Sequence, residues 1–405
     1  MIKLLAINTT FRDEIFYARW RFLAQKNKDL DVSLVGPSNW KNKAFGKDIE
    51  WKPECIDEDR FRVFHINMPN NKWTYLINGM VSLDIFKVIK KVRPDVIYLI
   101  GYETDNLVLE ISILKKMFVP KAKIIGFTMR GLDMPVKTLR FKIPWFFTSK
   151  IFDAYFCHYP HGKNVLLEQG KFKKPVYMQT QIGVNGKTFR PNVESRMKVR
   201  RKYNITDSEF VFGSASRIDS EKGIFDIING LPEKGSWKFM MLGDGIDFIK
   251  VKKAIEDKGL QDNVILTGYV KNGEGVAEYM NAMDCFIHVP RTTKTWIDTF
   301  PLAVVQAMAT GLAVIGSTSG AVSYQLGKDG IIIPERSPEA LKKEMIKMIN
   351  KPESAREIGN KNLKRVHGAF EIEHLNKCFN ELIRQTMIGE YDSRQIDQTN
   401  FYFKY

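Results

Sequence analysis

Short, continuously apolar segments alternate along this chain with amphipathic stretches, and this alternation limits its fold more than any other feature. Strands that are apolar on both faces are buried on both faces. Strands separated by helices form right-handed βαβ units with parallel sheets. The sequence therefore predicts a doubly wound α/β architecture. The predicted strands span residues 4–8, 32–36, 95–102, 123–129, 154–159, 176–183, 210–215, 237–243, 264–270, 285–289, 313–317 and 330–334.

The length and a pause in this alternation predict the domain organisation. A chain of 405 residues is long enough for two or three domains. The pattern pauses at residues 189–192, and a basic stretch follows. We therefore expect two Rossmann-like domains, 1–190 and 191–370, facing a cleft, followed by a C-terminal helix and tail at 371–405. Ligands of such sheets bind outside the carboxyl ends of the strands, which makes the cleft the expected active site.

Positive charge is concentrated in the first half of the chain. Lys and Arg number 62 against 46 Asp and Glu, which gives a formal net charge of +16. Residues 1–190 hold 32 basic and 18 acidic residues, whereas residues 191–405 hold 30 and 28. This asymmetry indicates an anionic partner for the first half, either a membrane surface or a nucleic acid. Solubility from scattered lysines is the simpler interpretation.

Residues 136–150 mix cations with aromatic side chains and contain no acid. Rings that enter the interface and cations that meet lipid phosphates suit an anionic membrane surface. The same mixture is compatible with a core helix interrupted by Pro144, or with stacking on nucleic-acid bases, which we consider unlikely. The residues expected at a membrane surface are Lys137, Arg140, Lys142, Trp145 and Phe146.

Several classes of protein are disfavoured by the sequence. The four cysteines are far apart without a CxxC pair, which argues against zinc or iron–sulfur sites and favours a cytoplasmic location. No apolar run reaches the roughly 18 residues of a membrane helix. The start of the chain reads as a strand and not as a signal peptide. Two triplets, 29–31 and 57–59, resemble a metal-binding DxD motif, but they lie in polar connections.

Two glycine-containing segments follow predicted strands in the second half. The first, residues 213–223, places Arg217 and Lys222 at the carboxyl end of a strand beside a helix N-terminus. Two fixed cations and a helix dipole suit a diphosphate, although two solvated loop cations are an alternative. The second, residues 242–245, contains Gly243 and allows the backbone to approach a ligand closely, or simply forms a tight turn.

A third segment, residues 296–311, reads as a loop followed by a helix. The helix is expected from Leu302, with Pro301 in its first turn and Gly311 at its end. Its first N–H groups suit a phosphate. Gln306 lies one turn further on, within reach of a ribose, and Asp298 in the preceding loop suits sugar hydroxyls.

These three segments in order, together with the AMATGLAVIGS run at residues 307–317, resemble the retaining glycosyltransferases of family 4. The family has the GT-B fold, and the resemblance covers most of residues 205–335. Residues 181–191 and 283–287 also resemble segments of this family. The resemblance implies that the final helix crosses back onto the first domain.

The resemblance also implies roles. Arg217 and Lys222 would neutralise the diphosphate of a nucleotide-sugar donor, of which uridine is the commonest base in this class. The transfer would need no metal and no cofactor. The other implied donor-binding residues are Gly243, Asp298, Phe300, Pro301, Leu302 and Gln306.

Three positions depart from the family pattern. The family has glutamate at both ends of an eight-residue step, where this chain has Asp298 and Gln306. Arg130 stands where the family tends to have a histidine, and an arginine cannot act as a base. Arg130 would bind a donor sugar or an acceptor phosphate, or else pair with Asp133. The catalytic residues that the resemblance implies, with Arg130 taken at the histidine position, are Asp298, Arg217, Lys222 and Arg130.

The sequence as a whole predicts a hexosyltransferase that acts on a lipid-linked or glycan acceptor in polysaccharide or glycoconjugate biosynthesis. Its first domain would bind this acceptor at the inner face of the cell membrane, as a peripheral cytoplasmic protein. Two rivals stay open. One is a catalytically degenerate GT-B scaffold subunit of a membrane complex, and the other is a DNA glucosyltransferase, for which the binding of duplex DNA would weaken steeply with salt.

Overall fold

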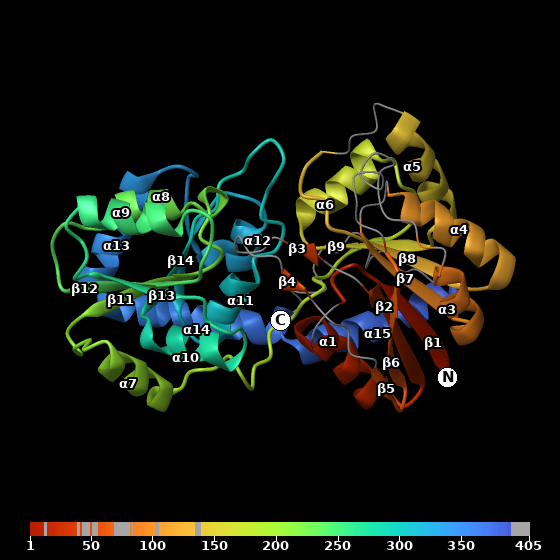
Figure 1. Cartoon of the computed structure of the whole chain (residues 1–405), viewed down its shortest axis with the longest axis horizontal. Helices are drawn as coiled ribbons and strands as arrows, with labels where there is room; N and C mark the ends of the chain where they lie inside the picture. Colours follow the sequence, from red (N-terminus) through yellow and green to blue (C-terminus); the bar gives the residue numbers. More distant parts are fainter. Residues whose placement is uncertain are drawn as a thin grey trace. The chain divides into compact units, whose positions relative to one another are not determined.

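The computed structural model describes residues 1–11, 14–38, 41–42, 49–50, 56–68, 82, 84–101, 105–133 and 139–389. These residues divide into two compact units (Figure 1). The first unit contains the described residues up to Ile182 and those from Leu375 onward. The second unit is Gly183–His374.

The first unit is built on one sheet that is parallel except at one edge. Its strand order is β10-β9-β8-β7-β1-β2-β6-β5, and only the β5–β6 pairing within it is antiparallel. A separate antiparallel pair is formed by β3 (Lys41–Asn42) and β4 (Ile49–Glu50). The sheet strands are β1 (Ile2–Ile7), β2 (Leu30–Pro37), β5 (Ile56–Glu58), β6 (Phe61–Ile66), β7 (Val96–Gly101), β8 (Lys123–Thr128), β9 (Ala154–Cys157) and β10 (Val176–Met178).

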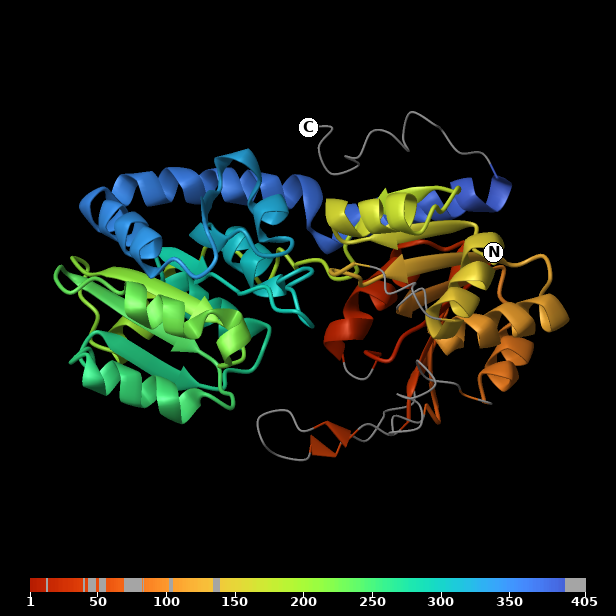
Figure 2. The same ribbon diagram turned by 90° about the horizontal axis from the view of Figure 1, so that it is seen from above.

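Helices cover both faces of this sheet. One side carries α15 (Ile372–Ile388) and α1 (Glu14–Lys26), whose Phe379 and Trp20 rings meet edge to face at 5.4 Å. The other side carries α3 (Ile85–Val92), α4 (Asn106–Phe118) and α5 (Leu139–Ile151), as Figure 2 shows. After β9 come α6 (Pro160–Asn164) and a π-helical turn at Val165–Gln169.

A buried arginine ties α15 to the first unit. Arg19 of α1 donates from Nη1 to the carbonyl oxygens of Thr180 and Gln181 at 2.7 and 2.8 Å, and from Nε to Asn376 Oδ1 at 3.0 Å. Its guanidinium also lies 5.1 Å from the centre of the Phe379 ring. Arg19 therefore joins two parts of the chain: the segment that follows β10, through the carbonyls of Thr180 and Gln181, and α15, through Asn376.

The second unit has a six-stranded, wholly parallel sheet in the order β13-β12-β11-β14-β15-β16. The order reverses between β11 and β14, and such a switch point is where ligands of doubly wound sheets bind. Its strands are β11 (Phe210–Ala215), β12 (Trp237–Leu242), β13 (Val264–Gly268), β14 (Cys285–His288), β15 (Ala313–Ser317) and β16 (Ile331–Ile333).

The helices of the second unit also lie on both sides of its sheet, with α8, α9 and α13 on one side and α7, α10 and α14 on the other (Figure 1). Strand residues of alternating orientation are buried against both layers, as expected for continuously apolar strands. The helices are α7 (Val193–Lys202), α8 (Ile224–Gly230), α9 (Phe248–Asp257), α10 (Glu274–Ala282), α11 (Leu302–Ala309), α12 (Val322–Leu326), α13 (Pro338–Asn350) and α14 (Pro352–Ala369).

The predicted α/β fold class is confirmed, since both units are doubly wound parallel sheets. The interruption considered at Pro144 is wrong, because α5 runs through it. Pro144 is buried within α5, although its ring removes one backbone N–H from the helix. None of the described helices is both long and apolar enough to cross a membrane.

Candidate functional site

A pocket of about 220 Å³ lies at the carboxyl ends of β11, β12 and β13. It brings together four of the residues singled out from the sequence, namely Arg217, Gly243, Leu302 and Gln306. They come from three separate segments of the chain: the loop after β11, the loop after β12 and the first turns of α11. This pocket therefore lies where the topology of the sheet places a ligand.

The start of α11 supplies backbone donors to this pocket. The helix begins at Leu302, immediately after Pro301, and Leu302 and Ala303 both line the pocket. The first N–H groups of a helix have no partner within it, and the helix dipole favours an anion there. Gln306 is buried one turn further on, and its Nε2 donates to Asn272 Oδ1 at 3.3 Å.

Arg217 is the exposed cation of the pocket. Its side chain is 53% exposed, and Nη1 lies 2.8 Å from Asp219 Oδ2. The other carboxylate oxygen of Asp219 accepts from the N–H of Lys222 at 3.2 Å and so caps a short 3-10 turn. Asp219 itself is buried, so Arg217 is the exposed partner of a half-buried ion pair and its guanidinium also faces the pocket.

Lys222 is held in a buried cluster. Its Nζ donates to Asp298 Oδ2 at 2.7 Å and lies 4.5 Å from the centre of the Trp296 ring. The same oxygen lies 3.1 Å from Nε2 of His288, at the carboxyl end of β14. Although burial opposes it, contact with His288 and Lys222 holds the pKa of Asp298 well below its usual range. Burial lowers the pKa of His288 despite the nearby carboxylate.

Two glycines allow these loops to pack closely. Gly223 has φ +70°, and a Cβ there would lie 1.9 Å from the carbonyl oxygen of Val289. Gly243 has φ +137°, and a Cβ there would meet the carbonyl oxygen of Ser216 at 1.9 Å. Gly243 therefore lets the loop after β12 approach the loop after β11, in addition to lining the pocket.

The remaining predicted residues lie around this pocket or in the first unit. The Phe300 ring stands 5.8 Å from that of Phe370, and Asp298 and Lys222 do not line the pocket. Arg130 belongs to the first unit, where it is buried after β8 and its N–H donates to Thr128 Oγ1 at 3.1 Å.

The residues predicted for a membrane surface fall on different sides of α5. Lys142 and Phe146 are exposed, whereas Trp145 faces inward and donates from Nε1 to the Gly170 carbonyl at 2.9 Å. Trp145 thus helps to anchor the helix within the unit, while its indole remains partly exposed. Lys137 and the side chain of Arg140 lie outside the described residues.

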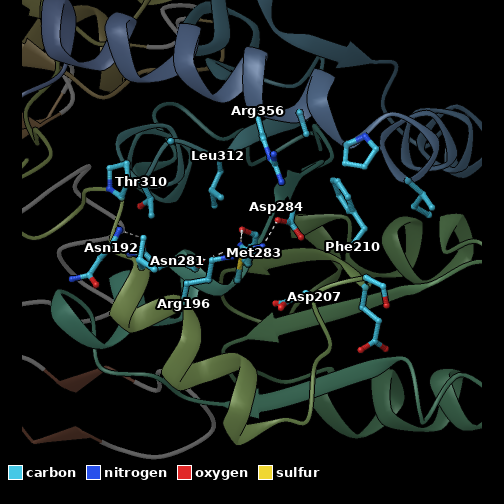
Figure 3. A pocket seen from close by; sticks show the side chains of 18 of the residues that line it. Asn192, Arg196, Asp207, Phe210, Asn281, Met283, Asp284, Thr310, Leu312 and Arg356 are labelled. Carbon is cyan, nitrogen blue, oxygen red and sulfur yellow. Dashed lines mark hydrogen bonds and ion pairs between the residues drawn. The ribbon is translucent and has the colours of Figure 1, made fainter.

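A larger cavity of about 550 Å³ opens at the amino ends of the strands of the same sheet, where β11 and β14 begin (Figure 3). Its Asp284 carboxylate is fully paired, because Arg196 and Arg200 each lie 2.7 Å from a different one of its oxygens. Asn281 accepts from the N–H of Asn192 at 2.6 Å. These contacts fix the segment that leads into α7, and the amino ends of parallel strands are not where such sheets bind ligands.

Four residues near the pocket escaped the sequence analysis. His288 is the last residue of β14, and Tyr269 directly follows β13. Because ligands of such sheets bind at the carboxyl ends of the strands, these positions could have identified both residues from the sequence. Tyr269 is 66% exposed at the pocket, and Asn272 holds Gln306. Trp296, whose ring lies against Lys222, has no such signal because its loop is irregular.

The acidic triplets are engaged in ion pairs. Asp29 pairs with Arg384, and Asp31 pairs with Arg62. Across the described part of the chain, no group of three or more His, Cys, Asp or Glu side chains is arranged to hold a metal ion.

Comparison with known proteins finds similarity to glycosyltransferases, and the matched family model lies within the second unit. Residues 195–365 match the model described as Glycosyl transferases group 1. The chain is 27% identical over 212 residues to an alpha-monoglucosyldiacylglycerol synthase of Acholeplasma laidlawii, covering 51% of this chain and 49% of that one. It is 25% identical over 273 residues to a GDP-mannose-dependent alpha-mannosyltransferase of Mycobacterium tuberculosis, covering 66% and 65%. The chain thus matches about half to two thirds of the length of these relatives.

Solved structures agree on the fold. Sucrose-phosphate synthase from Thermosynechococcus elongatus superposes with a TM-score of 0.74 at 16% identity, covering 96% of this chain and 100% of that chain. Anabaena HepE in complex with UDP superposes with a TM-score of 0.70 at 14% identity, covering 95% and 100%. The chain therefore has the two-domain GT-B fold, and its residues 195–365 are similar to the group 1 glycosyl transferases.

Proposed function

We propose that this protein is a retaining, metal-independent glycosyltransferase of family 4 that moves a hexosyl group from a nucleotide sugar to a lipid-linked or glycan acceptor. The observation that carries the proposal is the convergence of Arg217, Gly243, Leu302 and Gln306 on one pocket at the carboxyl ends of β11–β13. A cation, a helix N-terminus and a buried amide are what a diphosphate and a ribose require. With a volume of about 220 Å³, the pocket would take the nucleoside part of a larger donor.

The base is proposed to be uridine, since HepE has been solved with UDP and with UDP-glucose and shares this fold. Guanosine is the alternative base, because one relative is a GDP-mannose-dependent mannosyltransferase. Either diphosphate would lie against the N–H groups of Leu302 and Ala303. Arg217 would then exchange Asp219 for a phosphate oxygen.

Asp298 is proposed to contact the donor sugar through its second oxygen. Asp298 Oδ2 lies within hydrogen-bond distance of both Lys222 Nζ and His288 Nε2. Within the described residues, Oδ1 makes no hydrogen bond. The lowered pKa keeps the carboxylate ionised, so it acts only as an acceptor for sugar hydroxyls. The charge that develops on the leaving phosphate would be stabilised by Arg217 and by Lys222.

The first unit is proposed to bind the acceptor, with Arg130 at its site, and to rest on the cytoplasmic face of an anionic membrane. Leu139, Ile143, Phe146 and Phe147 of α5 are all exposed, by 72%, 49%, 53% and 39%. Their spacing places them on one face of the helix, together with the exposed Lys142. An apolar stripe edged by cations suits a lipid interface, and one relative is a glycolipid synthase by name.

The membrane surface is tested with Ile143→Ser/Phe146→Ser in a vesicle sedimentation assay. Losing two half-exposed apolar side chains should weaken binding to vesicles with anionic lipid by roughly 30-fold. The control is Ile246→Ser/Ile249→Ser, an even more exposed apolar pair in the second unit. Equal binding by the α5 variant and the native protein would refute this surface.

The reaction is tested by incubating the protein with UDP-glucose, UDP-galactose or GDP-mannose and a membrane lipid extract. We expect one donor to release its nucleoside diphosphate only when the extract is present, and NMR of the product to show a retained anomeric configuration. Gln306→Ala should lower this turnover, whereas the exposed pair Lys252→Gln/Lys253→Gln should not. Nucleotide binding without turnover of any donor would favour the scaffold alternative, and transfer to duplex DNA would favour the DNA glucosyltransferase.

A further inference from the structure

A cavity of about 410 Å³ in the first unit is lined by six lysines and a single carboxylate. It lies where β8 begins and where α4 and α5 end. The carboxylate is already committed, because Asp153 Oδ2 accepts from the N–H of Ile124 at 2.9 Å and Oδ1 lies 3.3 Å from Lys123 Nζ. The lysines are Lys115, Lys116, Lys121, Lys123, Lys150 and Lys174.

The fold itself explains only part of this cluster. Lys174 Nζ donates to the carbonyl oxygens of Lys150 and Phe152 at 3.0 and 2.6 Å, and Lys115 Nζ donates to that of Pro120 at 2.8 Å. Cations at helix C-termini are favoured by the dipole, which accounts for these two. Burial lowers the pKa of Lys174, and the nearby Lys123 and Lys115 lower it further, as expected where ammonium groups crowd together.

Three lysines of the cavity have no such structural role. Within the described residues, Lys116, Lys121 and Lys150 make no ion pair with a carboxylate, and all three are exposed. Lys150 Nζ instead lies 4.0 Å from the centre of the Phe146 ring, so the cavity borders the apolar stripe of α5. Ile113 and Met117 of the adjoining α4 are also exposed, by 58% and 65%.

We propose that this lysine cavity is a binding site for a phosphate group, separate from the donor pocket of the second unit. Three unpaired ammonium groups around a concave surface, with two more fixed by carbonyls, match a compact anion with several acceptor oxygens. The same phosphate chemistry occurs in an anionic lipid headgroup and in a soluble phosphate ester. The inference stands on the cavity alone and does not depend on the proposed transfer reaction.

The test compares the native chain with Lys116→Gln/Lys121→Gln, a pair of exposed residues whose loss leaves no buried partner. One arm measures sedimentation with phosphatidylcholine vesicles that do or do not contain phosphatidylglycerol. The other arm measures inorganic pyrophosphate and glycerol 1-phosphate by calorimetry. The matched control is Lys252→Gln/Lys253→Gln on α9, which removes the same charge from the second unit.

We expect the Lys116/Lys121 variant to bind about 30-fold more weakly, since each lysine near an anionic group contributes about 1 kcal/mol, or roughly a fivefold factor. Loss confined to phosphatidylglycerol vesicles would identify a lipid headgroup as the source, and loss confined to the soluble anions would identify a free phosphate ester. Native affinity in the variant for every probe, or no binding of any probe by the native chain, would overturn the site. UDP binding by the same variant keeps this result separate from the donor pocket of the second unit, and hydrogen exchange in β8 checks the folding of the first unit.

Discussion

The ion pair between Lys222 and Asp298 should be a large contributor to the stability of the second unit. At the 2.7 Å that separates Nζ from Oδ2, the attraction is about 6 kcal/mol for an effective dielectric constant of about 20. The side chains are only 14% and 10% exposed, so desolvation offsets part of this gain. Removing one partner nevertheless leaves the other charge buried and without its partner.

We therefore expect Asp298→Asn to lower the free energy of unfolding by about 3–5 kcal/mol. Lys222→Met should cost less, toward the lower end of that range, because His288 still contacts the carboxylate. The double variant should be more stable than the sum of the two losses predicts, by about 2–3 kcal/mol. Additive losses would refute the reasoning.

The assay is hydrogen-exchange mass spectrometry in urea, read on peptides from β11 and β14, so that the free energy refers to the second unit. Lys222→Met should also raise the pKa of His288, because the lysine charge lowers it in the native protein. Native-like titration of His288 by NMR in that variant would contradict the proposed cluster.

Other predictions concern single residues. Arg217→Ala should weaken nucleoside diphosphate binding by roughly 10- to 100-fold in calorimetry and lower the free energy of unfolding by about 1–3 kcal/mol, because it leaves the buried Oδ2 of Asp219 without its partner. Burial lowers the pKa of His288, so the unfolded state takes up this proton first, and stability should fall as the pH drops below about 6.5. His288→Gln should reduce that slope by up to about 1.4 kcal/mol per pH unit in urea titrations. Arg19→Met should destabilise the first unit by about 2–4 kcal/mol in hydrogen exchange, because it leaves buried carbonyls unpaired. Burial raises the pKa of Cys157 to about 12, so this thiol should resist iodoacetamide at pH 8 until the protein unfolds.

The strands with uniform hydrophobicity were the predictable part of the fold. The bounds of β11 and β15 match the predicted strands, because a strand buried on both faces is read directly from its composition. β6 was missed, since Arg62 and His65 interrupt its apolar run at the side of the sheet that β5 borders. A search for continuous runs does not detect such a strand.

Part of the lining of the pocket at the carboxyl ends of β11–β13 was predictable, but the contacts among the predicted residues were not. Residues at the carboxyl ends of parallel strands must converge, so the meeting of Arg217 with Gln306 follows from topology. The pairing of Lys222 with Asp298 joins residues 76 positions apart, and it depends on loop geometry fixed by Gly223 and its approach to Val289. Similarly, nothing in the sequence indicates that Trp145 points inward while Phe146 points outward.

The most direct test of the account is calorimetry of UDP, GDP, ADP and uridine with the native chain and with Arg217→Ala. The proposed donor site predicts that one nucleoside diphosphate binds the native chain and binds Arg217→Ala at least tenfold more weakly. The exposed control Lys253→Ala should retain native affinity. A folded native chain that binds none of the nucleotides, or an Arg217→Ala variant that binds as tightly as the native chain, would contradict the account.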